Sequence, residues 1–226
     1  MASISSTALR LLAIEALAPS AGYAAEAPVW PTLCEGRVYD SGAIPFDRTP
    51  AAGGPVSGRI HVAVYTDEVR GAPRGEAYGL SPQDLTVDLI FDLEIPMVDG
   101  ATGEIGIGET DAAGVALIDG GAAQIRWVLS VGTTGAAFRR LAKGFGPLEA
   151  RWTRHPELSV RLARVTLRLP VAIDDDDWTD VVDGLPWPAH AVRDALPPSS
   201  YGAGILDSLA ALWTSPADPT ALAEIR

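Results

Sequence analysis

Apolar and polar side chains alternate along three segments of this chain, residues 59–65, 85–95 and 163–173. A period of two residues is typical of β-strands with one buried face and one polar face. The apolar positions are Ile60, Val62, Val64, Leu85, Val87, Leu89, Phe91, Leu93, Ile95, Val165, Leu167, Leu169, Val171 and Ile173. We expect these strands to form one mostly antiparallel sheet, with shorter strands at 37–40 and 149–153.

The polar positions of the second and third strands carry opposite charges. Asp88, Asp92 and Glu94 alternate with the apolar residues of one strand, and Arg164 and Arg168 do so in the other. If the two strands are neighbours, these side chains face each other, and each opposite-charge pair contributes roughly 0.2–1 kcal/mol. We therefore expect the charges to help fix the register, because a slip by one residue would expose every apolar side chain.

Helical spacing appears on either side of the strands. An apolar set within 4–14 predicts a first helix that ends near Ala18 and begins at a serine cap, Ser3, Ser5 or Ser6. Further helices are predicted over about 115–129 and 136–143, the latter with Gly144 as its C-terminal cap. The glycine-rich residues 103–108 are predicted to be a hairpin loop. This pattern indicates an α+β fold in which helices cover the apolar face of one sheet.

The character of the sequence changes after residue 173. An aspartate run, Asp174–Asp177, is predicted to be a solvated turn, and it opens a proline-rich, acidic stretch. This stretch contains one amphipathic helix, predicted over Tyr201–Trp213. We therefore divide the chain into an α+β domain, residues 1–173, and a C-terminal extension, residues 174–226. The extension is too small to fold alone, so it packs either on its own domain or on a partner.

The formal net charge is −12 and it is unevenly distributed. Residues 126–168 contain nine basic and two acidic residues, among them Arg139 and Arg140, whereas the flanking parts are acidic. An acidic surface repels the phosphate backbone, which disfavours tight DNA binding. The basic segment leaves two alternatives open, docking on an acidic surface of a neighbouring subunit or pairing within one monomer.

Candidate chemistry is sparse. The three histidines are far apart in sequence, no nucleophile, phosphate-binding or metal-binding motif is present, and the single cysteine, Cys34, excludes an intrachain disulfide. We therefore expect no catalytic, cofactor or metal site. Two of the six tryptophans, Trp127 and Trp152, are expected in the core. Trp178, Trp187 and Trp213 lie in polar surroundings and are candidate interface anchors.

The N-terminal segment allows a second interpretation. Residues 8–18 are apolar and Gly22-Tyr23-Ala24 offers small residues for cleavage, but no basic residue precedes the apolar run and Arg10 and Glu15 interrupt it. A cleaved signal peptide would make the protein a secreted or periplasmic binding domain. No apolar run approaches the ~20 residues of a membrane-spanning helix.

The order of several short segments resembles the tail terminator (minor tail) proteins of lambda-like siphophages and related prophage or gene-transfer particles. After the first helix come Arg37–Ser41 (RVYDS), Val64–Glu68 (VYTDE), the strand Leu85–Ile95, the helix Leu117–Leu129 and the strand Arg161–Ile173. The resemblance covers about residues 4–173. It implies a hexameric ring that caps the tail tube and joins it to the neck or head, in a virion assembled in the host cytoplasm.

The same resemblance implies the partners. They are other copies of the chain, the tail tube protein and a neck or connector protein, with DNA passing through the lumen without specific binding and with no membrane contact. The segment 67–84, which carries Arg70, Arg74 and Tyr78, corresponds to a loop that meets a neighbouring subunit or the tube. A neck or head-completion protein is the nearest alternative, and an enzyme is the most distant one because no residues are grouped for it.

Overall fold

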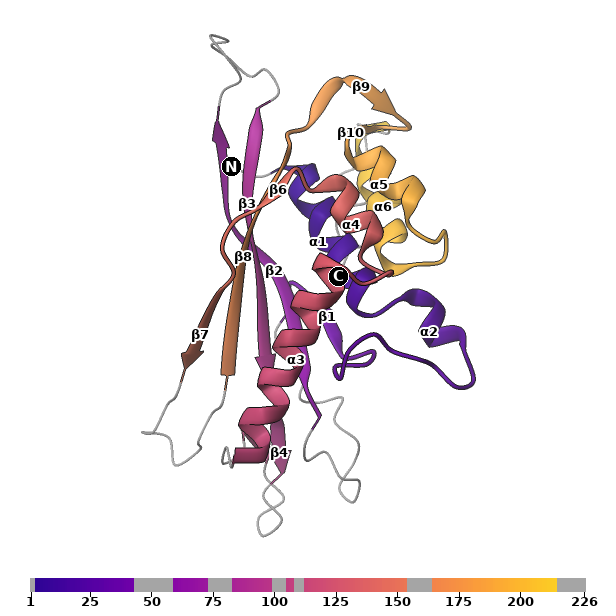
Figure 1. Ribbon diagram of the computed structural model, residues 1–226. Coiled ribbons are helices and arrows are strands. Elements are labelled where there is room, and N and C mark those ends of the chain that lie inside the picture. The colour runs from indigo at the N-terminus through magenta and orange to yellow at the C-terminus, as the bar shows by residue number, and fades with distance from the viewer. Residues whose placement is uncertain are drawn as a thin grey trace.

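One mixed, mostly antiparallel sheet runs through the molecule (Figure 1). The computed structural model describes residues 3–42, 59–72, 83–98, 105–107, 112–153 and 164–214. The sheet has six strands in the order β1-β2-β3-β8-β6, and β7 also pairs with β8. Its strands are β1 (Val38–Asp40), β2 (His61–Ala72), β3 (Asp84–Glu94), β6 (Gly144–Phe145), β7 (Glu149–Thr153) and β8 (Arg164–Asp174). Two small hairpins complete the strands, β4 (Pro96–Val98) with β5 (Ile105–Ile107) and β9 (Asp177–Val182) with β10 (Leu185–Trp187).

The predicted alternation of the long strands is confirmed. In β2, β3 and β8, almost all of the apolar positions are buried in one hydrophobic core, and β3 pairs antiparallel with both neighbours. Strand β1 differs from the antiparallel expectation, since it pairs parallel to β2, with Val38 opposite Val62. The long connection between these two strands permits this direction, because parallel neighbours need a crossover rather than a tight turn.

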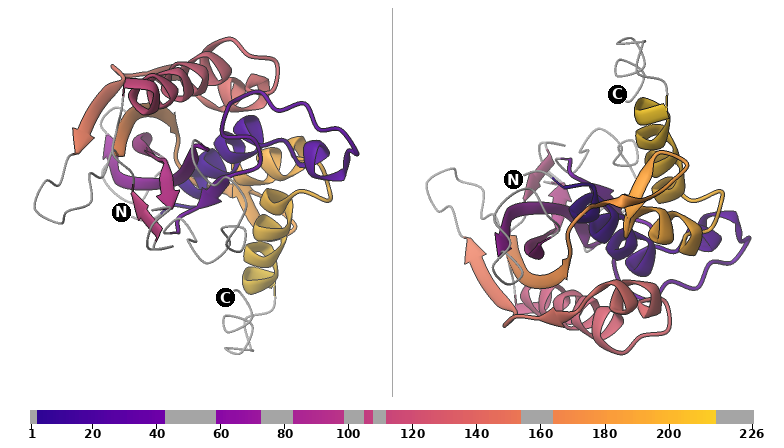
Figure 2. Two further views of the ribbon diagram at one scale, coloured as in Figure 1. Left: turned by 90° about the horizontal axis from the view of Figure 1, so that it is seen from below. Right: turned by 90° about the horizontal axis from the view of Figure 1, so that it is seen from above.

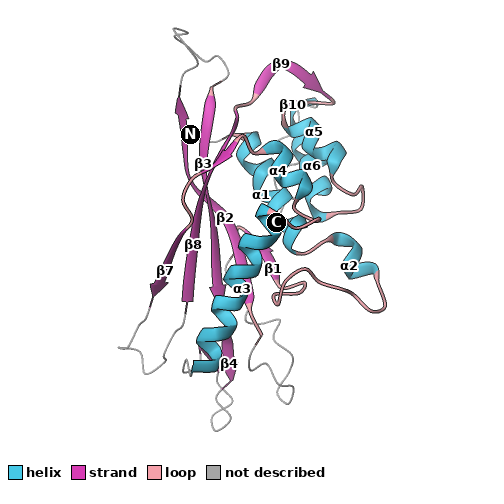
Figure 3. Cartoon of the chain, viewed as in Figure 1, coloured by secondary structure: helices cyan, strands magenta, loops and turns pink. Residues whose placement is uncertain are grey.

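Helices cover one face of the sheet, as predicted (Figures 1 and 3). They are α1 (Ile4–Leu17), α2 (Ser20–Ala24), α3 (Ala112–Ser130), α4 (Ala136–Leu141), α5 (Ala189–Ala195) and α6 (Tyr201–Thr214). Helix α1 is the central one, with ten of its fourteen residues buried. Helix α3 comes close to the sheet at Gly121, where an added Cβ would lie 2.7 Å from Cδ1 of Ile60. The glycine that weakens the helical pattern in the sequence therefore has a packing reason.

The N-terminus of α1 is capped from the far end of the chain. Oδ2 of Asp176 accepts a hydrogen bond from the backbone N–H of Ile4 (2.9 Å), and Oδ1 accepts from the N–H of Ser5 (2.8 Å) and from its hydroxyl (2.5 Å). Ser3, one of the three predicted cap residues, does occupy the N-cap position, but its side chain makes no capping hydrogen bond. The aspartate run is likewise not simply a solvated turn, because one of its carboxylates satisfies the free N–H groups of a helix.

The described part of the C-terminal extension packs on its own domain, which is one of the two alternatives raised by the sequence. Its buried side chains Leu185, Val192 and Leu206 belong to the same hydrophobic core as the sheet. Helices α5 and α6 both contact α1. The chain turns between β9 and β10 at Asp183-Gly184, both with positive φ, and this dipeptide is a hairpin signal that the sequence analysis did not use.

Three local expectations were wrong. Gly144 does not cap α4, which ends at Leu141; it begins β6 and pairs with Ala172. Residues 105–107 form strand β5 rather than part of a loop. The segment after Asp67 continues as strand β2 to Ala72, past an irregularity in register between Thr66 and Val69. The loop predicted over 67–84 is therefore shorter on its N-terminal side.

Candidate functional site

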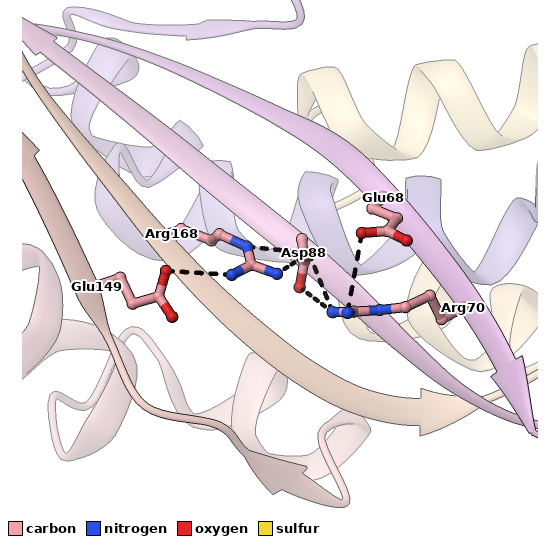
Figure 4. Close-up of polar contacts among 5 residues, drawn as sticks. All are labelled: Glu68, Arg70, Asp88, Glu149 and Arg168. Carbon is pink, nitrogen blue, oxygen red and sulfur yellow. Dashed lines mark hydrogen bonds and ion pairs between the residues drawn. The ribbon is translucent and has the colours of Figure 1, made fainter.

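Charged side chains form a line across the face of the sheet that the described helices leave uncovered (Figure 4). At its centre the carboxylate of Asp88 on β3 is only 1% exposed. Arg168 on β8 donates to Oδ2 of Asp88 from Nε (3.0 Å) and Nη2 (2.6 Å). Arg70 on β2 donates to both oxygens from the other side, at 3.0 and 3.1 Å. Two arginines on neighbouring strands thus neutralise one buried carboxylate.

Two more acidic residues extend this line to five residues on four strands. Glu149 on β7 lies 3.1 Å from Nη1 of Arg168, and Glu68 lies 3.8 Å from Nη1 of Arg70. We call Glu68, Arg70, Asp88, Arg168 and Glu149 the charge ladder. Its charges alternate in sign, and its outer members are more than half exposed. Each arginine of the ladder therefore lies between two carboxylates, and the three acidic and two basic residues leave one formal negative charge.

A second carboxylate, Asp92, lies four residues after Asp88 on the same face of β3. It is 2% exposed and accepts hydrogen bonds from the hydroxyls of Tyr65 (2.7 Å) and Thr166 (2.5 Å) and from Arg164. Burial alone would raise the pKa of Asp92, but the hydrogen bonds from Arg164, Thr166 and Tyr65 hold it below its usual value. Burial and the hydrogen bond to Asp92 raise the pKa of Tyr65 to about 12.

Glu94 shares Arg164 with Asp92 but less closely, with 3.4 Å between its Oε1 and Nε of the arginine. Burial raises the pKa of Glu94 above its usual value, and the attraction of Arg164 only partly opposes this. The five charges predicted to face one another, Asp88, Asp92, Glu94, Arg164 and Arg168, are thus brought together by the β3–β8 register. The sequence did not reveal how deeply the carboxylates are buried, because neighbouring side chains cover them.

This arrangement links strands β2, β3, β7 and β8 through their side chains. The two buried carboxylates already have donors on both oxygens, and Tyr65 is held in its neutral form at neutral pH. No group of three or more metal-ligating side chains occurs among the residues that the structure describes. His61 lies beside Tyr39, with 3.1 Å between the tyrosine oxygen and Nδ1 of the histidine. Burial is the main cause that lowers the pKa of His61 to about 4.

Of the seven basic residues of segment 126–168 that the structure describes, three form ion pairs within the monomer, namely Lys143, Arg164 and Arg168. Lys143 contacts Asp84 (2.9 Å) and Asp174 (2.5 Å), in addition to the pairs of Arg164 and Arg168. Arg139, a predicted interaction residue, instead donates to the carbonyls of Val128 (3.2 Å) and Leu129 (3.3 Å), at the C-terminal end of α3. Its neighbour Arg140 is exposed and only bonds within its own helix. The other predicted interaction residues Arg74 and Tyr78 lie outside the described residues, and Arg70 belongs to the charge ladder.

The tryptophans give the exposed surface most of its aromatic character. Trp178 on β9 and Trp213 on α6 form an edge-to-face pair, with 4.9 Å between ring centroids, and are 48% and 58% exposed. Trp187 stacks edge-on against His190 and is also exposed. Trp152 is partly buried against the core, in line with the prediction. Trp127 was predicted in the core, which is wrong, because it is 56% exposed.

Trp127 belongs to an exposed apolar strip on α3. Val131 follows directly after the end of α3, where its N–H donates to the carbonyl of Trp127 (2.8 Å). Leu33 rests on α3 about one turn before Trp127, where its N–H donates to Oε1 of Gln124 (2.7 Å). We call Leu33, Trp127 and Val131 the α3 surface, and the pair Trp178 and Trp213 the α6 surface. Figure 2 shows α3 and the last turn of α6 on opposite sides of the molecule.

A third exposed region is a cavity of about 650 Å³ between α1, β1 and α6, with both apolar and polar side chains in its lining. Asp40 on its wall is bound by Nε of Arg10 (2.5 Å), by the hydroxyl of Tyr201 (3.0 Å) and by Ser41 (2.9 Å). Burial and the neighbouring Asp40 raise the pKa of Tyr201 to about 12. The polar groups of this wall are therefore satisfied by one another, as they are on the sheet face.

Comparison with known proteins adds no identity to this picture. The sequence matches no protein-family model and no curated protein. Among the described residues, no helix is long and apolar enough to cross a membrane.

Proposed function

We propose that this chain is a structural protein of a virion that closes into a ring, and that the ring ends the tail tube and connects it to the neck or head. The observation that carries the proposal is the placement of the α3 and α6 surfaces. They are different from each other, both expose aromatic side chains, and they lie on opposite sides of one subunit. A head-to-tail contact between two unlike patches generates a ring when the rotation closes.

The identity of the ring comes from the resemblance of residues 4–173 to tail terminators, which implies six copies. The charge distribution fits a conduit for DNA. The arginines of β2 and β8 are held by buried carboxylates, so they are not available to bind the phosphate backbone. The net charge of one subunit is −12. An acidic lumen would repel DNA and keep it from adhering during passage.

The test is native mass spectrometry on the full chain, alone and with the tail tube protein of its particle. We expect a single closed oligomer for the wild type. Trp127→Glu disrupts the α3 surface and Trp213→Glu disrupts the α6 surface, so both variants should be monomers. Val29→Glu is the matched control, because Val29 is exposed and lies outside both surfaces.

Mixing the two variants separates a ring from a symmetric dimer. Each variant retains one intact surface, so an equimolar mixture should give a one-to-one heterodimer and nothing larger. A contact that uses the same patch on both subunits would give no such heterodimer. A wild-type protein that stays monomeric alone and with the tube protein contradicts the proposal.

A neck or head-completion protein is the second candidate within the same class. It is favoured by the same two surfaces, because such proteins also form rings, and the position of the density in an image of the intact particle distinguishes the two. The secreted alternative requires removal of about residues 1–24. Those residues include α1, the most buried helix of the fold, and a mass measurement on natively produced protein would detect the loss.

A further inference from the structure

An apolar cavity of about 280 Å³ opens beside the α3 surface. Its floor is formed by Phe91, Ile125 and Leu167, which are all buried. Arg126 and Phe145 are exposed members of its lining and mark its opening. Arg126 forms no ion pair with any residue that the structure describes.

The cavity suits a particular kind of occupant. A dry cavity of about 150 Å³ is enough to bind benzene, so this one has room for roughly two aliphatic side chains. A single cation at the opening favours a carboxylate next to those side chains. The expected occupant is therefore a short peptide with two aliphatic residues and an acidic residue between or beside them.

The chain itself contains such a segment. Residues 215–226, which follow α6 and lie outside the described residues, read SPADPTALAEIR. Leu222 and Ile225 are its two large aliphatic residues, and Glu224 lies between them. Both the apolar character and the charge match the cavity.

The distance that the extended segment can span decides whether it fills the cavity of its own subunit or that of another subunit. Leu222 is eight residues beyond Thr214, so it reaches at most about 28 Å from the end of α6. A compact chain of this length has a radius of gyration of about 17 Å, and the path around half of its surface is on the order of 70 Å. Because α3 and the last turn of α6 lie on opposite sides (Figure 2), the segment fits a neighbouring subunit better than its own.

We propose that residues 220–226 of one subunit dock in the cavity between α3 and β8 of the next subunit, with Leu222 and Ile225 on the apolar floor and Glu224 beside Arg126. This proposal rests on the ring described above and adds an arm that ties consecutive subunits together. It uses the same side of the molecule as the α3 surface, so the two contacts support one head-to-tail geometry.

Thiol cross-linking of the full chain tests the arm. Cysteines are introduced as Ser130→Cys in the lining of the cavity and Ala223→Cys in the arm, and a short bismaleimide is added. The native Cys34 is 1% exposed and does not interfere. We expect a ladder of covalent oligomers under denaturing conditions. The matched control replaces Ser130→Cys by Ala116→Cys, an exposed position on the same helix about 21 Å away, and should give no ladder.

Charge reversal tests the predicted partner of Arg126. Either Arg126→Glu or Glu224→Arg alone should lower the cross-linking yield about two- to fivefold, the factor that corresponds to an exposed ion pair. The double reversal should restore the yield. Leu222→Asp should abolish the ladder, since it places a charge on an apolar floor.

The two proposals fail in different measurements. A ring in native mass spectrometry that gives no ladder overturns the arm and leaves the ring standing. A cross-link found only within single chains also overturns the arm, because it places the segment on its own subunit. Neither a ring nor a ladder at any concentration overturns both. An unrelated protein that occupies the cavity in the particle and leaves Ala223→Cys unreactive overturns the arm as well.

Discussion

Two carboxylates on one strand, Asp92 and Glu94, should respond to neutralisation in opposite ways. Both face Arg164, but Asp92 accepts three hydrogen bonds at 2% exposure, whereas the side chain of Glu94 is paired with only the arginine among the described residues, at 3.4 Å. The pKa of Asp92 is held down and that of Glu94 is raised. At neutral pH the charge on Asp92 therefore stabilises the fold and the charge on Glu94 opposes it.

The size of the effect follows from the hydrogen bonds. Each bond to a charged group contributes about 1.5–3 kcal/mol, but Asn retains part of them and the partly exposed Arg164 regains water. Asp92→Asn should then lower the free energy of unfolding by about 2–3 kcal/mol. For a chain of this length, that corresponds to a fall in Tm of roughly 4–12 °C. Glu94→Gln should leave Tm unchanged or raise it slightly, because it removes a buried charge with one weak partner.

Urea unfolding followed by circular dichroism at pH 7 and at pH 3.5 measures both effects, at a protein concentration that keeps the oligomer state fixed. The contribution of Asp92 is present above the pKa of about 3.9 that an unfolded Asp has, and is lost as the pH falls through its lower folded value. The cost of ionised Glu94 disappears once it is protonated. Both differences from wild type should shrink at pH 3.5. If Glu94→Gln costs as much as Asp92→Asn at pH 7, the reasoning about burial and donors is wrong.

Three further predictions concern single residues. Asp176→Asn should lower the free energy of unfolding by about 1–2 kcal/mol through loss of the α1 cap, measured by urea unfolding, whereas the exposed Asp119→Asn should have no effect. His61 has a folded pKa of about 4, below its unfolded value of about 6.5, so the free energy of unfolding should fall as the pH drops between these values. His61→Gln should make that fall smaller in a pH series of unfolding curves. An unchanged pH dependence would contradict this prediction. Arg139→Gln should weaken the C-terminal end of α3, seen as faster amide exchange there, with the exposed Arg140→Gln as control.

The long strands were predictable because a period of two carries both their burial and their partners. The apolar set of β3 specifies which face meets the core, and the opposite signs of Asp88 and Arg168 specify which strand comes next. Once those two strands are neighbours, the register follows from the need to bury every apolar residue at once. This part of the fold depends on short-range patterns, which a sequence displays directly.

Contacts between distant parts of the chain were not predictable in the same way. Asp176 lies about 170 residues from the N–H groups that it caps, and no local pattern links them. The burial of Asp88 also depends on arginines from two other strands, so its sequence position alone suggested an exposed charge. Trp127 occupied an apolar stretch of α3 and was expected inside, but the inner face of that helix was already filled by Ile118, Ile125 and Val128.

The way in which charges and aromatics divide the surface has a consequence for recognition. Where Arg168 holds Asp88 and Arg164 holds Asp92, breaking these bonds for a partner would cost as much as the new bonds return. The sheet face is therefore a poor source of binding free energy, although its outer glutamates contribute to the long-range field. Trp127 and Trp213, by contrast, make contact with water over about half of their surface, and that area becomes available when a partner covers it. Assembly of this protein should depend on its apolar surfaces and respond weakly to salt, because screening acts on exposed charges and not on buried apolar area.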